Sequence, residues 1–235
     1  MKIRYEVFLF ISIMLSATFG LTAEEKKTTR GGVGYFMLGY EATDLSDFND
    51  ALEAAGYSTF AEKMFSMGGA GYAIKDRLII GGEGYALIQK DKRTGTLETS
   101  LSGGVGFFNI GYILHKQKNF WIYPLLGLGG GGMNFSILEK SQIPSFEEVL
   151  ENPERGVDMY AGGLLLQVAI GGDVLLNFEQ KKDKKGGLVL ALRIGYTFTP
   201  MSDNWYMNDM EITGGPDLHL TGPFVRLGFG GGGFE

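Results

Sequence analysis

The sequence contains no cysteine. This absence excludes disulfide frameworks, thiolate metal sites, cysteine nucleophiles and a lipid-modified N-terminal cysteine. Acidic residues outnumber basic ones, 27 to 21, for a formal net charge of -6, so nucleic acid is not an expected partner. Beyond residue 23 there is also no run of ~18 apolar residues, which argues against a later helical membrane span.

The first 23 residues predict a secretory signal peptide. Lys2 and Arg4 form a basic start, Val7–Phe19 forms the apolar stretch, and Gly20–Ala23 ends it with small residues. Cleavage after Ala23 or after Gly20 fits this pattern, and an uncleaved anchor is the alternative. The expected organisation is therefore a signal peptide over 1–23 and a single domain over 24–235.

After this segment, extended stretches alternate with turn or charge clusters. Eight strands are predicted: Gly31–Glu41, Met64–Ile74, Leu78–Gln89, Thr96–Leu114, Phe120–Leu138, Val157–Phe178, Leu188–Thr199 and Gly222–Phe234. Short charged connections (75–77, 115–119, 179–187) alternate with longer ones (42–63, 90–95, 139–156, 200–221). An up-and-down barrel with periplasmic turns and longer outer loops has this alternation, whereas a soluble sandwich has no reason to sort its loops in this way.

Side-chain alternation supports the same fold. In the seventh strand one face carries Leu188, Leu190, Leu192, Ile194, Tyr196 and Phe198, and the sixth strand also has one apolar face. Each face spans the ~9–11 residues needed to cross a bilayer at a tilt. The predicted fold class is all-β, an eight-stranded antiparallel up-and-down transmembrane β-barrel with short helices in its outer loops. A change of phase at Gly103–Gly106 predicts a bulge.

Glycine is in excess, at 38 of 235 positions, more than twice the usual ~7 per cent. It clusters in GGVGY (31–35), GGAGY (68–72), GGEGY (81–85), GGVGF (103–107) and GGGG (129–132). The recurrence and the lack of a GK[ST] sequence argue against a phosphate-binding loop. In a narrow barrel, these glycines are expected to make room for the aromatic residues beside them.

Four charged residues fall on faces assigned to the interior: Glu83, Asp173, Arg193 and Arg226. Strands six and seven form a hairpin around Lys182–Asp183, which places Asp173 near Arg193. Because unpaired charges are costly in a low-dielectric interior, we expect these residues to form an ion-pair cluster. The expected role is a structural plug of the lumen, with a gate or proton path as the alternative.

The outer loops offer the remaining candidate sites. Asp44–Gly56 predicts a helix capped by Asp44 or Ser46, and Ser145–Asn152 predicts a second one. His219 shares the last loop with Ser202, Asp203, Asp209 and Asp217, which suggests a serine hydrolase or acyltransferase site. The alternative is a divalent-cation site formed by Asp203, Asp209, Glu211 and Asp217. The candidate outer-loop site comprises Asp203, Asp209, Glu211 and His219. Solvated loop acids are the favoured interpretation, with no catalytic residue, metal or other cofactor.

Aromatic residues lie near the predicted membrane boundaries. Phe120, Trp121 and Tyr123 follow the second inner turn, and Trp205 and Tyr206 lie in the last outer loop. They fit the interfacial aromatic girdles of a membrane barrel, and core packing is the alternative.

With these features, the chain resembles the small eight-stranded barrels of the bacterial outer membrane, a group that includes the membrane domain of the major outer-membrane protein A and the OmpX and OmpW types. The resemblance is architectural and carries no functional residue across. Phe224–Glu235 resembles the C-terminal insertion signal in its alternation and its near-terminal aromatic residue, but differs in its four consecutive glycines and final Glu235. The resemblance of this segment to the insertion signal implies recognition by the barrel assembly machinery.

The main functional hypothesis is a monomeric outer-membrane barrel with a structural, surface-binding or small-amphiphile passage role. Its expected partners are membrane lipid, the barrel assembly machinery and a small apolar ligand or an extracellular partner. Two alternatives stay open: a barrel enzyme acting on lipid or peptide at the outer rim, and a secreted soluble β-protein that binds lipid or sugar.

Overall fold

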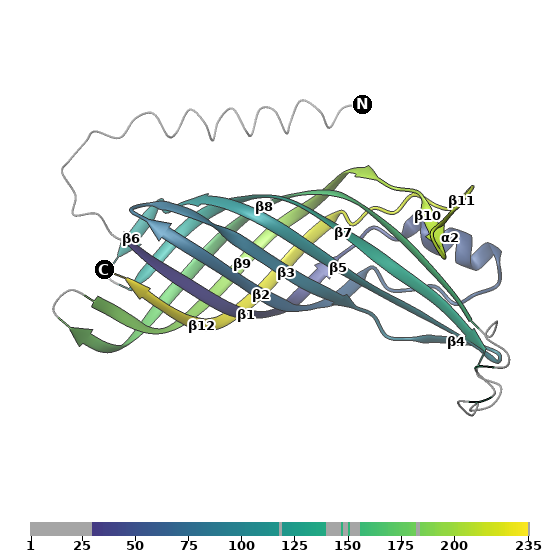
Figure 1. Cartoon of the computed structure of the whole chain (residues 1–235), viewed down its shortest axis with the longest axis horizontal. Coiled ribbons are helices and arrows are strands. Elements are labelled where there is room, and N and C mark those ends of the chain that lie inside the picture. Colours follow the sequence, from purple (N-terminus) through teal and green to yellow (C-terminus); the bar gives the residue numbers. More distant parts are fainter. Residues whose placement is uncertain are drawn as a thin grey trace.

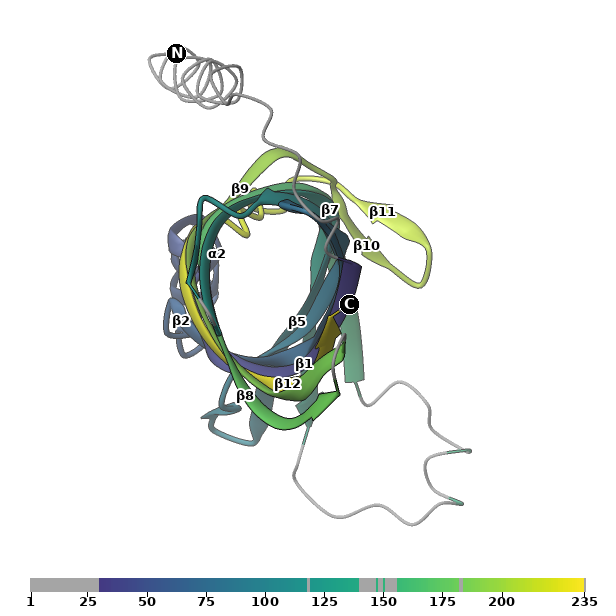
Figure 2. The ribbon, with the colours of Figure 1, turned by 90° about the vertical axis from the view of Figure 1, so that its left-hand side faces the viewer.

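The computed structural model describes residues 30–117, 119–139, 147, 150, 156–181 and 184–234, with the backbone alone between 177 and 185. Eight antiparallel strands close into a barrel: β1 (Arg30–Ala42), β2 (Lys63–Lys75), β3 (Leu78–Ile88), β5 (Leu97–Tyr112), β7 (Phe120–Glu139), β8 (Gly156–Lys181), β9 (Lys184–Ser202) and β12 (Gly222–Phe234). The first and last strands pair from Gly31 with Phe234 to Glu41 with Phe224, so the ring is complete (Figure 2). The predicted fold class is confirmed.

Smaller elements decorate the two ends of the barrel. Helix α2 (Ser46–Ala54) and strands β4 (Lys92–Thr94), β10 (Trp205–Met207) and β11 (Met210–Ile212) gather at one end, opposite Arg30 and Phe234, and β6 (His115–Gln117) lies at the other (Figure 1). The end with the longer loops is the outer end. Within the described residues, no helix has the length and apolar character that crossing a membrane requires.

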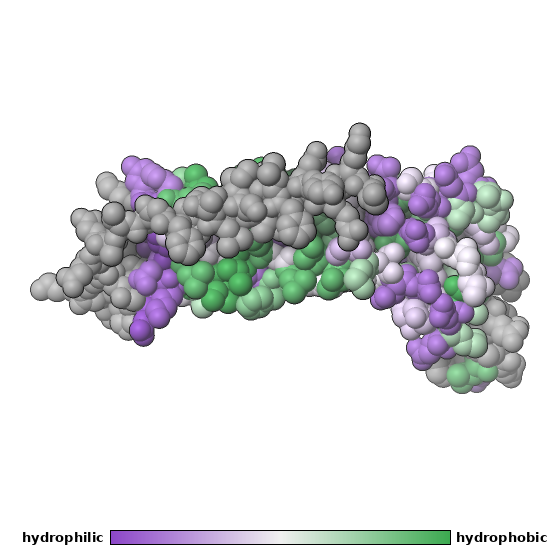
Figure 3. Space-filling model, turned by 90° about the horizontal axis from the view of Figure 1, so that it is seen from above, coloured by the Kyte–Doolittle hydropathy of each residue, from purple (hydrophilic) through white to green (hydrophobic). Residues whose placement is uncertain are grey.

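The barrel wall has an apolar exterior. Figure 3 shows a hydrophobic band across the middle of the visible face, with hydrophilic surface at both ends. Its outward side chains include Phe36, Met67, Ile80, Phe108, Ile110, Leu126, Leu128, Leu164, Leu166, Ile170, Leu190, Leu192, Ile194, Val225, Leu227 and Phe229. The alternation predicted for the sixth and seventh strands is confirmed. In β8, Leu166 and Ile170 are exposed while Gln167 and Ala169 are buried, and in β9, Leu190 and Ile194 are exposed while Val189 and Arg193 are buried. We call this band the apolar belt.

The bulge predicted at Gly103–Gly106 is wrong. These residues pair in unbroken register with β3 and with β7. Outward glycines weaken the alternation of side chains in the sequence there, which produced the apparent change of phase. The register shifts lie elsewhere, between β8 and β9 at Leu164/Leu166 and at Asn177/Glu179.

The glycines of the wall differ in their surroundings. A Cβ atom on inward Gly171 would overlap the ring of Tyr123, so glycine there makes room for an aromatic side chain, although Gly171 lies outside the clusters for which this was predicted. In contrast, a Cβ atom on exposed Gly34 would meet nothing within 4 Å. The glycine excess is thus explained by packing at inward positions but not at Gly34.

The predicted signal peptide (1–23) lies outside the described residues, as does most of the predicted second helix (145–152). The first helix is present as α2. Its predicted cap is displaced by one position, because Leu45 occupies the N-cap and its side chain is buried. Asp44 still assists the helix start, since its Oδ1 accepts hydrogen bonds from the Ser46 backbone nitrogen and hydroxyl. These bonds lower the pKa of Asp44, the hydroxyl having the larger effect.

Candidate functional site

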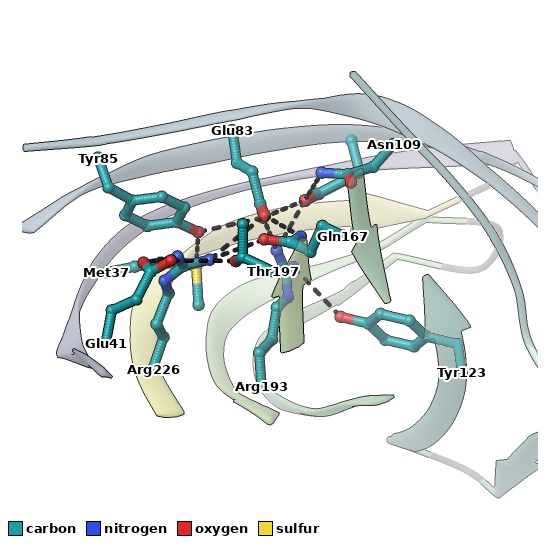
Figure 4. Close-up of polar contacts among 11 residues, drawn as sticks. Met37, Glu41, Glu83, Tyr85, Asn109, Tyr123, Gln167, Arg193, Thr197 and Arg226 are labelled. Carbon is teal, nitrogen blue, oxygen red and sulfur yellow. Dashed lines mark hydrogen bonds and ion pairs between the residues drawn. The ribbon is translucent and has the colours of Figure 1, made fainter. Parts of the chain in front are cut away.

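The interior of the barrel holds a buried network of charged residues (Figure 4). Arg193 of β9 donates a hydrogen bond from Nη1 to Glu83 Oε2 of β3 at 2.8 Å. Arg226 of β12 donates from Nη2 to Glu41 Oε2 of β1 at 2.7 Å, and its Nη1 lies 3.5 Å from Glu83 Oε1. Both arginines are fully buried. The two acids therefore compensate two cations that water cannot reach.

The sheet register explains why Glu83 is central to this network. Arg193 and Arg226 are direct partners on β9 and β12, and both face inward, so two positive charges lie side by side. Like charges directly opposite each other destabilise a sheet. Glu83 offsets this repulsion because one of its carboxylate oxygens faces each arginine.

Neighbouring polar groups satisfy the carboxylates of the network, whereas Nε of Arg193, Nε of Arg226 and Oδ1 of Asn109 have no hydrogen-bond partner in the described residues. Glu83 accepts hydrogen bonds from Tyr72, Tyr85 and Gln167 at 2.6, 3.1 and 2.6 Å. Thr197 donates to Glu41 at 3.0 Å, and Asn109 donates to the Tyr72 hydroxyl at 3.0 Å. A buried ion pair is tolerated only when its remaining lone pairs are satisfied in this way.

Aromatic rings pack against both guanidinium groups. The Arg193 guanidinium lies 4.5 Å from the centroid of Tyr72, and that of Arg226 lies 3.8 Å from Tyr85 and 4.0 Å from Phe224. At these distances the ring faces attract the cations, and the attraction is stronger where water is excluded. The rings also fill the space between the wall and the arginines.

Asp173 belongs to the same interior but has a different role from the one expected. In the described residues, no ion pair joins it to an arginine. It instead accepts hydrogen bonds from Tyr35 at 2.5 Å, from Trp121 at 3.1 Å and from Tyr123 at 2.8 Å. Because Arg193 Nη2 donates to the Tyr123 hydroxyl at 3.3 Å, the tyrosine links this aspartate to the ion pairs.

The sequence analysis missed Glu41, which it treated only as the last residue of the first strand. Glu41 is 1% exposed and pairs with Arg226. Its position in the alternation carried the necessary signal, because it shares a face with Val33, Tyr35 and Met37, all of which are buried.

A hydrophobic cap covers the outer mouth of the barrel. Phe48 and Leu52 of α2 are buried. The Phe48 ring stacks on Trp205, with centroids 5.5 Å apart, and packs edge-on against Phe135 at 5.1 Å. Trp205 also donates a hydrogen bond from Nε1 to the Pro216 carbonyl at 2.7 Å. The first and last outer loops therefore join over the lumen.

The candidate outer-loop site does not assemble. Asp209 accepts a hydrogen bond from Tyr160, Glu211 accepts one from Asn204, and His219 pairs with Asp44 in an isolated β-bridge. The Asp203 backbone nitrogen donates to the Gly162 carbonyl at 2.7 Å. Across the part of the chain that the structure describes, no three His, Asp or Glu side chains are grouped as metal ligands.

Of the five aromatic residues predicted to lie in girdles, Phe120 is exposed and Tyr206 is half-buried, so the prediction stays open for these two. Trp121 and Tyr123 are buried in the lumen and Trp205 is buried under the cap, so the girdle interpretation is wrong for them. Their indole and hydroxyl hydrogen bonds to interior acceptors explain the difference. A true boundary pair lies elsewhere: Tyr40 and Phe65 meet edge-on with centroids 5.7 Å apart on the outward face, near the outer end of β1.

A closed antiparallel barrel with an apolar belt outside and a filled polar interior defines the class of protein: it is an integral β-barrel of the bacterial outer membrane. No protein-family model matches the sequence, and no curated protein matches it.

Solved structures of outer-membrane proteins show similarity to the chain. Ail, the attachment invasion locus protein of Yersinia pestis, is 9% identical with a TM-score of 0.40, covering 89% of this chain and 99% of Ail. Neisserial surface protein A is 10% identical with a TM-score of 0.40, covering 89% and 98%. The outer membrane protease OmpT from Escherichia coli is 10% identical with a TM-score of 0.33, covering 92% and 99%. No residue role is transferred from these proteins.

Proposed function

We propose that the barrel is closed to solutes and acts in the outer membrane as a scaffold that presents its outer loops. The observation that carries this proposal is the buried ion-pair network across the lumen. An eight-stranded barrel is only just wide enough for its own side chains. The buried network therefore fills the space that a water-filled path would need.

Three layers of side chains support a closed lumen. Asp173 and its aromatic donors lie toward the inner end, the Glu83 network lies in the middle, and the cap around Phe48 lies at the outer mouth. Passage of a small amphiphile would require at least the middle layer to break its ion pairs. Separating a buried ion pair leaves uncompensated charges, at a cost of about 3–5 kcal/mol.

The same geometry favours presentation of the loops over catalysis. The cap fixes the first and last outer loops to each other through Phe48 and Trp205. His219 pairs through its backbone with Asp44, and the acids of its loop have separate partners. We therefore propose a non-enzymatic, monomeric barrel that the barrel assembly machinery inserts and whose outer loops meet an extracellular partner.

Electrical recording tests the closed lumen. The full chain, reconstituted into a planar lipid bilayer, is expected to give no stable unitary conductance. The triple variant Glu83→Ala, Arg193→Ala, Arg226→Ala serves as the comparison, because it removes the middle layer and is expected to raise ion leakage. Stable open-channel steps from the unmodified protein would overturn the proposal.

A further inference from the structure

The described basic residues at the outer end are confined to one sector, whereas acids lie all round it. Acids predominate there, and in the described residues they include Asp47, Asp50 and Glu53 of α2 and Asp203, Asp209, Glu211 and Asp217 of the last loop. The described lysines and arginines of this end are four, and all lie around β2, β3 and β4: Lys63, Lys90, Lys92 and Arg93. Three acids lie among these four residues: Glu62, Asp91 and Glu98, the last being the register partner of Arg93. We call the four basic residues the basic sector.

The register fixes the height of the basic sector above the apolar belt. Tyr40, Phe65 and Ile88 form one outward-facing row across β1, β2 and β3. Lys63, at the outer end of β2, lies two residues beyond Phe65, and Lys90 lies two residues beyond Ile88, the last residue of β3. Two residues of a strand rise about 7 Å, and the headgroup layer on each side of the ~30 Å hydrocarbon core is about 5–7 Å deep. The lysines are therefore level with the headgroups of the outer leaflet.

A surface depression lies beside Lys90. It encloses about 610 Å³ and is lined by Lys90, Lys92 and Arg93 on one side and by Tyr57, Ser58 and Thr59 on the other, with Glu53 and Asp91 contributing two acids. The two sides are joined, because the Ser58 backbone nitrogen and hydroxyl lie 3.1 and 3.0 Å from Thr94 Oγ1. The depression thus combines cations with hydroxyl groups, and hydrogen bonds between Ser58 and Thr94 connect its two sides.

We infer that the basic sector binds the phosphorylated sugar headgroup of an outer-leaflet lipid. Lysine and arginine recognise phosphate by charge-assisted hydrogen bonds. The hydroxyls of Tyr57, Ser58 and Thr59 supply donors and acceptors for a sugar. The belt directly below the sector holds the acyl chains of the same lipid, so the site continues an interface that the fold already makes.

Lipid titration of the full chain in detergent tests this inference. The probes are a diphosphorylated glucosamine-disaccharide lipid, the same lipid after removal of its phosphates, and inorganic phosphate, with bound lipid counted by native mass spectrometry. The phosphorylated lipid is expected to bind about tenfold more tightly than the dephosphorylated one, a difference of about 1.4 kcal/mol. Equal affinity of the unmodified protein for the two lipids would overturn the inference.

A matched pair of variants locates the site. The fourfold change Lys63→Gln, Lys90→Gln, Lys92→Gln, Arg93→Gln is expected to abolish the preference for the phosphorylated lipid. The control Arg30→Gln, Lys75→Gln, Arg77→Gln, Lys116→Gln removes the same charge at the inner end and is expected to keep the preference. Equal loss in both variants, or displacement of the lipid by millimolar inorganic phosphate, would contradict a headgroup site. Heat-modifiable migration establishes that both variants fold.

Discussion

At the scale of single residues, Glu83 determines whether two adjacent arginines are tolerated inside the barrel. Its two oxygens face Arg193 and Arg226, which are register partners on neighbouring strands. We expect Glu83→Gln to lower the free energy of unfolding by about 3–5 kcal/mol, because it leaves buried charge uncompensated. Urea titration of the barrel in lipid vesicles measures this loss.

A second substitution separates charge from packing at this position. Adding Arg193→Gln to Glu83→Gln removes one of the adjacent cations and is expected to restore part of the lost stability. Glu53→Gln, at an exposed position of α2, is the control and should leave the unfolding midpoint unchanged. A double variant no more stable than Glu83→Gln alone would show that the repulsion is unimportant.

Gly171 gives a second prediction at this scale. Its missing side chain leaves room for the Tyr123 ring, whose hydroxyl donates to Asp173. Gly171→Ala is expected to displace that ring and to cost about 1–3 kcal/mol, as overpacking does in other cores. Gly34→Ala is the matched control, because nothing lies within 4 Å of its added Cβ atom. Equal unfolding midpoints for the two variants would refute the prediction that Gly171 makes room for the Tyr123 ring.

At the scale of elements, α2 is held by its aromatic contacts. Phe48 contacts both Trp205 and Phe135. Phe48→Ala is expected to remove about 3 kcal/mol of packing and to release α2 from the mouth. Limited proteolysis should then cut within residues 43–62 faster than in the unmodified protein, while heat-modifiable migration stays the same. Asp50→Ala, on the exposed side of α2, should leave the cutting rate unchanged.

The sequence predicted the barrel strands better than their connections. The eight strands were recognisable because alternation and loop length are local signals, and the hairpin of β8 and β9 extends to the pair Lys181–Lys184 around the expected turn. The short strands β4, β6, β10 and β11 were not predicted. Their formation depends on an adjacent strand edge, as for Tyr206 of β10 beside Tyr160 of β8, and a single strand's sequence does not encode that neighbour.

The interior network was partly predictable for the same reason. The alternation of inward and outward positions along each strand predicted that four charged residues lie inside: Glu83, Asp173, Arg193 and Arg226. It does not predict which residues meet across the lumen. The contact of Arg226 with Glu41 joins residues 185 positions apart. The pairing of Asp173 with three aromatic donors depends likewise on the stagger of the strands around the ring.

At the scale of the whole molecule, the apolar belt sets how the wall tolerates charge. Leu227 is 64% exposed in the middle of β12, whereas Met201 is 67% exposed near the outer end of β9. Leu227→Arg is expected to cost about 2–4 kcal/mol and Met201→Arg about 0–1 kcal/mol, because the penalty falls with distance from the bilayer midplane. Unfolding in vesicles by urea compares the two, and equal costs would place the belt elsewhere.

The two tryptophans occupy opposite ends of the molecule. Trp205 stacks under the cap, whereas Trp121 packs edge-on against Phe234, with centroids 5.2 Å apart, although β7 and β12 are not neighbours in the sheet. The latter contact requires the ring to be closed. Intrinsic emission from a Trp205→Phe chain would therefore follow ring closure during refolding, and emission from a Trp121→Phe chain would follow the docking of the loops, so each kinetic phase has its own optical probe.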